Sequence, residues 1–167
     1  MWNKELLNYD NHVIGKGFIV LYAKHLKSQK NIALVNVYAP CNAREKTALW
    51  EVITNIKLVN QTYNWCVLGD FNAVRRVNER KGKSVRSNQS SQTKRFNEFI
   101  DKNVLLEIRI VGRRFTWYKQ NGTIKSRLDR ILVSIEWLQE WPLSKQNIQV
   151  REISNQCAIV VKSVVKD

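Results

Sequence analysis

The sequence predicts an α/β (α+β) domain in which two packed mixed sheets are flanked by outer helices. Short runs rich in β-branched and aromatic residues outnumber the segments with helical periodicity. The connections mix hairpin turns with longer crossovers, which favours two packed sheets over one parallel, doubly wound sheet. The chain has 167 residues, of which 44% are hydrophobic, so residues 1–167 are predicted to form a single domain with a sizeable core.

The first predicted element is a hairpin. Residues 1–16 are polar, weakly patterned and without a helix cap, as if the chain began in the middle of a domain. Residues 17–23 and 31–38 are apolar runs joined by a basic linker, which predicts an antiparallel hairpin. Pro40 ends the second strand because proline removes a donor from the sheet.

Residues 43–58 are predicted to form a helix that Asn42 caps. Apolar residues recur at spacings of three and four and would face the core: Ala48, Leu49, Val52, Ile53 and Ile56. The charged residues of the same segment would face solvent: Arg44, Glu45, Lys46, Glu51 and Lys57.

A buried strand over residues 64–69 is the centre of the predicted fold. It breaks at Gly69 and places Asp70 and Asn72 at its carboxyl end, in one crevice if the backbone stays extended there. A carboxylate can take a proton from water and an amide can hydrogen-bond an oxyanion, so the pair suits chemistry on a phosphate. The alternative is an ordinary turn, since Gly, Asp and Asn are common turn residues.

The second half of the chain mixes a long loop with helices and strands. Residues 73–91 are rich in basic side chains and predict a surface loop that is either functional or a solvated charge run. Asn121-Gly122 indicates a hairpin turn. Helices are predicted over 92–106 and 135–141, and strands over 112–118, 126–133, 148–150 and 158–164.

Charge and cysteine content narrow the function. Lys and Arg number 28 against 14 Asp and Glu, and this net charge of +14 favours nucleic acid as a partner over an anionic membrane surface. The three cysteines form no CxxC pair, so neither a zinc site nor a disulfide framework is predicted. Reduced thiols, with no signal peptide and no apolar run that could span a bilayer, indicate an intracellular protein, nuclear or cytoplasmic.

Six short motifs in order resemble the endonuclease/exonuclease/phosphatase superfamily, most closely the apurinic-type endonuclease domain of plant LINE-type (non-LTR) retrotransposons. They start at Asn36 (NVYAP), Gly69 (GDFN), Glu79 (ERKG), Gly112 (GRRFTW), Ser126 (SRLDR) and Ser154 (SNQC). The resemblance covers nearly the whole chain from about residue 14. It implies a four-layered, DNase I-like α/β sandwich that cuts a DNA phosphodiester with a divalent metal, usually Mg²⁺.

The resemblance implies roles for particular residues. Asp70 would orient or deprotonate the attacking water, and Asn72 and Tyr38 would contact the phosphate. Asp129 would hold the catalytic histidine of a Ser-Asp-His motif. The resemblance also implies that Arg44 contacts DNA. Further nucleic-acid contacts are expected from the basic loop, through Arg75, Arg76, Arg80 and Lys81. Phe115 and Trp117 would form the wall of the substrate groove, and the alternative is that these rings pack in the core.

Two departures from the family bear on activity. Ser-Asp-His is here Ser154-Asn155-Gln156. Asn155 is neutral and a poor magnesium ligand, and Gln156 lacks the titration of histidine. The family's opening strands, with an active-site asparagine and a metal-binding glutamate, have no counterpart. The domain is therefore expected to be N-terminally truncated, with no metal-ligand set intact.

These observations leave three functions open. The first is a retrotransposon-derived, metal-dependent endonuclease domain with little or no catalysis. The second is a non-catalytic remnant that binds nucleic acid through basic phosphate contacts. The third is a working nuclease completed by another polypeptide, which no sequence feature supports directly.

Overall fold

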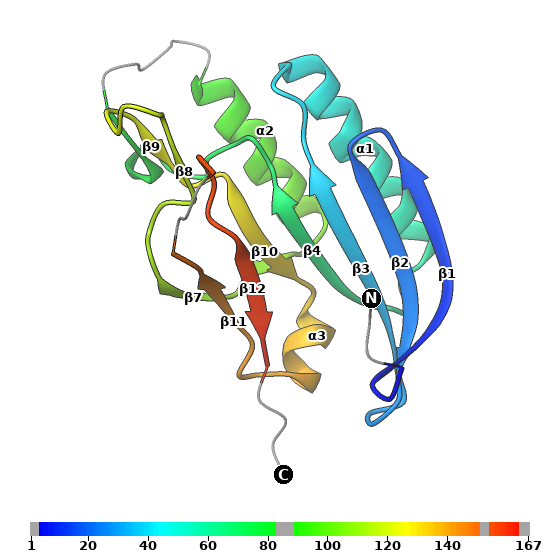
Figure 1. Cartoon of the computed structure of the whole chain (residues 1–167). Coiled ribbons are helices and arrows are strands. Elements are labelled where there is room, and N and C mark those ends of the chain that lie inside the picture. The colour runs from blue at the N-terminus through cyan, green and yellow to red at the C-terminus, as the bar shows by residue number, and fades with distance from the viewer. Residues whose placement is uncertain (1–3, 83–88, 151–153, 164–167) are drawn as a thin grey trace.

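The computed structural model describes residues 4–82, 89–150 and 154–163. The large sheet has the strand order β1-β2-β3-β4-β10-β6 (Figure 1). Its strands are β1 (Leu7–Gly15), β2 (Phe18–His25), β3 (Lys30–Tyr38), β4 (Asn64–Asp70), β6 (Leu106–Glu107) and β10 (Asp129–Val133). The pair β3–β4 is parallel and the other pairs are antiparallel.

Two helices cover one face of the large sheet, α1 (Ala43–Val59) and α2 (Gln89–Lys102) (Figure 1). Helix α1 is the crossover that a parallel strand pair requires. The core beneath the helices is aromatic, and the rings of Trp50 and Phe99 stack with centroids 4.8 Å apart beside Phe71 and Phe96. These rings remove large apolar areas from water and hold both helices on the sheet.

A three-stranded sheet packs on the opposite face of the large sheet. Its order is β12-β11-β7, from β12 (Ile159–Lys162), β11 (Lys145–Ile148) and β7 (Arg109–Gly112). Ile131, Val133 and Cys66 are fully buried between the two sheets. The short helix α3 (Ile135–Glu140) closes this second core with Trp137, and the following Trp141 packs against that ring. The predicted arrangement of two packed sheets with outer helices is thus confirmed.

A third, small sheet consists of β5 (Arg80–Lys81), β9 (Lys125–Ser126) and β8 (Trp117–Tyr118). The predicted turn at Asn121-Gly122 joins β8 to β9, and Gly122 has a φ of +70°. A buried ion cluster lies between this sheet and the large one, and it consists of Arg75, Arg127, Arg130, Glu79 and Glu107.

Several sequence predictions were wrong in detail. Residues 1–16 include the edge strand β1, which pairs with β2 along its length, although it is exposed on both faces and therefore shows no apolar alternation. The strand predicted over 112–118 is split into the end of β7 and β8. The strand predicted over 126–133 is also split, because β10 leaves the hairpin and inserts between β4 and β6.

The loop predicted over residues 73–91 is only partly a surface loop. Its first part contains a 3-10 turn (Val77–Glu79) and β5, and the buried Glu79 anchors it in the ion cluster. Residues 83–88 of this loop lie outside the described residues. Of the helices in the described part of the chain, none is long and apolar enough to cross a membrane.

Candidate functional site at the carboxyl end of β4

The carboxyl ends of β3 and β4 meet the start of β10 at one edge of the large sheet. The strand register pairs Asp70 with Tyr38 on one side and with Asp129 on the other. Tyr38 is 72% exposed, whereas Asp70 and Asp129 are only 9% and 8% exposed. This edge therefore carries two neighbouring buried carboxyl groups beside an accessible phenol.

The backbone turns sharply past β4. Gly69 has a φ of +129°, and a Cβ atom there would lie 2.1 Å from the carbonyl oxygen of Val37. Asn72 has a φ of +48°, and its N–H donates a hydrogen bond of 2.8 Å to Oδ1 of Asp70. The backbone is therefore not extended past Asp70, which the prediction of one shared crevice required, and the bend itself holds the Asp70 carboxylate.

The second oxygen of Asp70 is bound from the far end of the chain. Nε2 of Gln156 donates a hydrogen bond of 2.8 Å to Oδ2 of Asp70. Burial raises the pKa of Asp70, and the Asn72 N–H, the Gln156 amide and the charge of Lys46 oppose that rise. Both carboxylate oxygens are thus engaged by protein donors.

Asp129 lies in a less polar setting than Asp70. Its backbone N–H donates to the hydroxyl oxygen of Thr116 at 3.0 Å, but its buried Oδ2 has no hydrogen-bond partner within the described part of the chain. Burial and the nearby charge of Asp70 raise the pKa of Asp129 to about 6, against the lowering effects of Thr116 and Arg130. Asp129 is therefore a buried carboxyl group whose pKa is raised toward neutral pH.

Gln156 and Asn155 are held by backbone pairing with β8. The N–H of Tyr118 donates to the carbonyl of Asn155 at 2.9 Å, and Trp117 forms an isolated bridge with Gln156. The N–H of Cys157 donates to the carbonyl of Thr116 at 2.7 Å. This pairing directs the Gln156 amide to Asp70, while the Asn155 residue is exposed.

Lys46 was predicted to face solvent, and this was wrong. It is 4% exposed, and its Nζ donates to the carbonyl oxygen of Asn72 at 2.6 Å and to Oε1 of Gln92 at 3.0 Å. Burial lowers the pKa of Lys46, while Cys41 and Asp70 raise it. The signal was present in the sequence, because Lys46, Leu49, Trp50 and Ile53 follow an i, i+3, i+4, i+7 spacing.

The side chain of Asn72 also joins this network. Its Nδ2 donates to the sulfur of Cys41 at 3.1 Å and lies 3.4 Å from the carbonyl oxygen of Ala39. The amide that was expected to contact a phosphate is thus half-buried, with its donor directed at the chain that follows β3. An incoming phosphate would have to replace these contacts.

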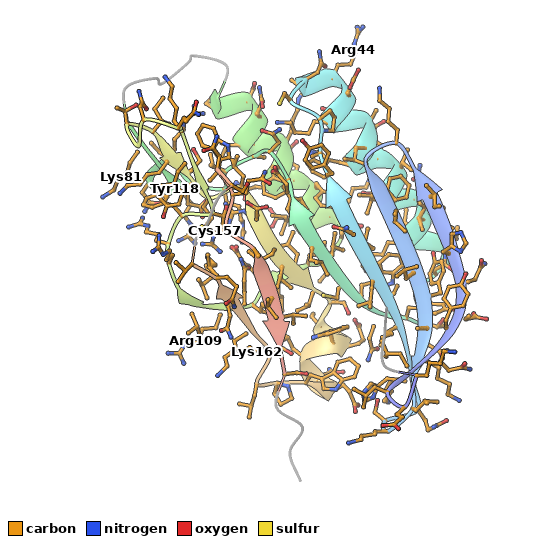
Figure 2. All side chains as sticks on the ribbon, viewed as in Figure 1. Arg44, Lys81, Arg109, Tyr118, Cys157 and Lys162 are labelled. Atoms are coloured by element: carbon orange, nitrogen blue, oxygen red, sulfur yellow. The ribbon has the colours of Figure 1, made fainter. Side chains whose placement is uncertain are left out.

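The basic residues predicted to bind nucleic acid divide into exposed and inward-facing groups. Arg44, Arg76 and Lys81 are exposed, and Figure 2 shows Arg44 pointing away from the N-terminal end of α1. Arg75 instead turns inward, with Nη1 3.2 Å from Oε2 of Glu107. Arg75, which was predicted to contact nucleic acid, is therefore engaged in the ion cluster.

The two predicted groove aromatics and Arg80 are not fully accessible either. Phe115 is buried, with the ammonium of Lys125 5.2 Å from its ring centre. Trp117 is half-buried on β8. Arg80 is half-buried, and its Nε has no hydrogen-bond partner among the residues that the structure describes. The core-packing alternative therefore describes Phe115 better than a role in the wall of an open groove.

The described residues do not fit a magnesium site. Among them, no group of three or more His, Cys, Asp or Glu side chains is placed to hold a metal ion. Magnesium prefers charged oxygen ligands in near-octahedral geometry. Both oxygens of Asp70 already accept hydrogen bonds, and of the four carboxylate oxygens of Asp70 and Asp129 only Oδ2 of Asp129 has no partner among the described residues.

Of the comparisons with known proteins, the one with solved structures identifies the fold. No protein-family model matches the sequence, and no curated protein matches it. The structure is similar to the endonuclease domain of TRAS1, a telomere-specific non-LTR retrotransposon, with a TM-score of 0.70 and 12% identity over 99% of this chain and 72% of that one.

Two bacterial structures are also similar. A mannosyl-6-phosphatase from Bacteroides thetaiotaomicron matches with a TM-score of 0.63 and 14% identity over 98% of this chain and 69% of that one. An endonuclease/exonuclease/phosphatase family protein from the same organism matches with a TM-score of 0.57 and 13% identity over 87% of this chain, which spans only 50% of that one. The fold implied by the six motifs is thus confirmed: the chain has the endonuclease/exonuclease/phosphatase, DNase I-like fold.

Proposed function

We propose that the chain is a retrotransposon-type DNA endonuclease domain whose reaction centre no longer supports efficient phosphodiester hydrolysis. The hydrogen bond from Gln156 to Asp70 carries this proposal. Support for the substrate class comes from the ordered motifs and from the similarity of the fold to the TRAS1 endonuclease domain. The basic net charge of +14 agrees with a polyanionic substrate.

Asp70 is poorly placed to activate water. A general base must reach the proton it removes, directly or through one water molecule. Here the Asn72 N–H and the Gln156 amide each donate one hydrogen bond to the carboxylate, one to each oxygen. A water molecule could bind Asp70 only through a remaining lone pair, in competition with these donors.

Gln156 cannot replace a histidine in proton transfer. An imidazole changes charge near neutral pH, whereas a carboxamide does not titrate there. Gln156 can still donate a hydrogen bond, and in this structure it gives that bond to Asp70. Asp129 is left beside the pair without an imidazole to orient, with one buried oxygen unpartnered.

The divalent metal expected from the resemblance, Mg²⁺, would neutralise charge on the phosphate when bound. The two carboxylates at the edge of β4 and β10 are the only described candidates to hold it, and they do not form a full ligand set. Catalytic groups that act as a unit fail together, so the expected rate is several orders of magnitude below that of an intact enzyme.

The test is nicking of supercoiled plasmid by the purified protein, with Mg²⁺ or Mn²⁺ and with chelator. We expect the unmodified protein and its Asp70→Ala variant to nick at the same background rate. Metal-dependent nicking that the Asp70→Ala change abolishes would overturn the proposal. Asp101→Ala, at an exposed position on α2, is the matched control for a lost carboxylate.

A second candidate function is nucleic-acid binding without cleavage. The observation that favours it is the exposure of Arg44, Arg76 and Lys81 on a strongly basic chain. Such contacts recognise phosphates without sequence preference, and their affinity falls steeply with salt. A salt titration of DNA binding distinguishes this function from a basic surface that only keeps the protein in solution. An affinity for DNA that does not change with ionic strength would reject binding through phosphate contacts.

A further inference from the structure

The three-stranded sheet β12-β11-β7, which packs on the large sheet, carries positively charged side chains in neighbouring positions on all three strands. In its register, Lys145 of β11 lies opposite Lys162 of β12 and opposite Arg109 of β7. Residues directly opposite one another in a sheet project from the same face. Arg109, Lys145 and Lys162 therefore form a row across all three strands, called here the cation row.

The cation row points away from the large sheet. The next residue of β11, Gln146, is fully buried, and its Oε1 accepts a hydrogen bond of 3.0 Å from the N–H of Ile131 in β10. Because successive side chains alternate between faces, Lys145 lies on the outer face. Arg109 and Lys162 are exposed, and Figure 2 shows both on this part of the molecule.

The row is not neutralised by the described part of the chain. There, no carboxylate forms an ion pair with any of its three cations. The buried ion cluster is the contrast, because its three arginines are bridged by Glu79 and Glu107. Like charges directly opposite in a sheet are destabilising, so an uncompensated row is a surface that gains stability from a bound anion.

We propose that the cation row binds the phosphate backbone of a nucleic acid at a second contact outside the edge formed by Asp70 and Asp129, an inference that rests on the proposed function. Three adjacent strands span about 10 Å, the axial rise that carries about three phosphates on one DNA strand. The next row along the sheet, Val111, Asn147 and Val160, offers a partly apolar strip beside the cations.

The cation row contains none of the residues of the candidate reaction edge. Gln156, which contacts Asp70, precedes β12, and Lys162 ends that strand. Six extended residues separate the two positions by at most about 20 Å. A nucleic acid that reached both places would gain affinity from the cation row, while the residues of the row do not belong to the edge formed by Asp70 and Asp129.

The experiment measures binding of a fluorescein-labelled 20-base-pair duplex by anisotropy, in EDTA, across a series of KCl concentrations. The test variant is Arg109→Gln/Lys145→Gln/Lys162→Gln. The matched control is Lys24→Gln/Lys27→Gln/Lys30→Gln, which removes the same charge from exposed positions at the β2–β3 connection. Circular dichroism establishes that each variant is folded.

The expected result is a specific change in salt dependence. Each lost phosphate contact reduces the slope of log K against log[KCl] by about 0.9, so the test variant should lose two to three units of slope and at least tenfold in affinity at low salt. The control should keep the parental slope. The single variants Arg109→Gln and Lys162→Gln, each expected to lose about one unit, provide the same readout if the triple variant does not fold.

Two outcomes would overturn the inference, and they are distinguishable. Equal slopes for the test and control variants, with salt-dependent binding by the parent, would reject the cation row and leave the proposed function intact. No salt-dependent binding by the parent would reject both the row and nucleic acid as the substrate class. The plasmid assay reports on the reaction centre independently, because binding is measured without metal.

Discussion

Replacing Asp129 with asparagine should stabilise the folded protein near and above neutral pH. The native pKa of Asp129 is raised to about 6 from an ordinary value of 3.8, chiefly by burial. When the pKa of a carboxyl group is higher in the folded protein than in the unfolded chain, the group contributes fully to the free energy of unfolding at pH values below the pKa of the unfolded chain. This contribution is lost as the pH rises through the pKa of the folded protein. Above about pH 6, Asp129 is therefore ionised while buried, and this lowers the free energy of unfolding of the protein.

The magnitude follows from the shift. A rise of about two pKa units at 1.36 kcal/mol per unit corresponds to about 3 kcal/mol above pH 6. Asparagine has nearly the same shape and cannot ionise, so the variant should escape most of this cost. Its advantage should be small below pH 4 and should grow to its full size by pH 7.5, where the melting temperature should rise by about 6–12 °C.

Urea denaturation at pH 4 and pH 7.5 measures this difference. Asp101→Asn, which removes a carboxylate from an exposed position, should change the free energy of unfolding by less than about 0.5 kcal/mol at either pH. An Asp129→Asn variant that is less stable than the parent at pH 7.5, or equally shifted at both pH values, would refute the assignment of a buried, destabilising carboxylate.

Three further changes probe the framework around this edge. Glu79→Gln leaves the fully buried guanidinium of Arg130 with Glu107 as its one remaining carboxylate partner in the ion cluster and should cost about 3–5 kcal/mol, seen in calorimetry as a melting point lower by on the order of 10 °C. Asn42→Ala removes the cap that accepts from two N–H groups of α1 and should cost about 1 kcal/mol in urea denaturation. Gly69→Ala forces a Cβ into the carbonyl oxygen of Val37 and should abolish soluble, folded protein in an expression trial.

Each of these predictions has a clear contrary result. The control Glu98→Gln, at an exposed position on α2, should leave the melting temperature nearly unchanged. A Glu79→Gln variant with the same melting temperature as this control would show that the loss of a carboxylate from the ion cluster does not destabilise the protein. An Asn42→Ala protein as stable as the parent would mean that water replaces the cap. A folded Gly69→Ala protein would require the close approach of β3 and β4 to relax.

The sequence predicted the elements whose signals are local. The runs at residues 17–23, 31–38 and 64–69 became β2, β3 and β4, because each is a β-branched or aromatic run with a turn signal at its end. The cap at Asn42 and the turn at Asn121-Gly122 were equally local. The edge strand β1 was missed because an edge exposed on both faces has no alternating pattern to detect.

The sequence by itself determined that Asp70 and Asn72 lie at the carboxyl end of a buried strand. It also determined that the motifs follow the order of a known fold, because both features depend only on spacing along the chain. Only the tertiary structure decided that Gln156 binds Asp70, that Lys46 turns inward, and that β10 brings Asp129 beside Asp70. These contacts join residues up to 86 positions apart. Strand order and register create such contacts, and a local pattern of side chains carries no information about which strands become neighbours.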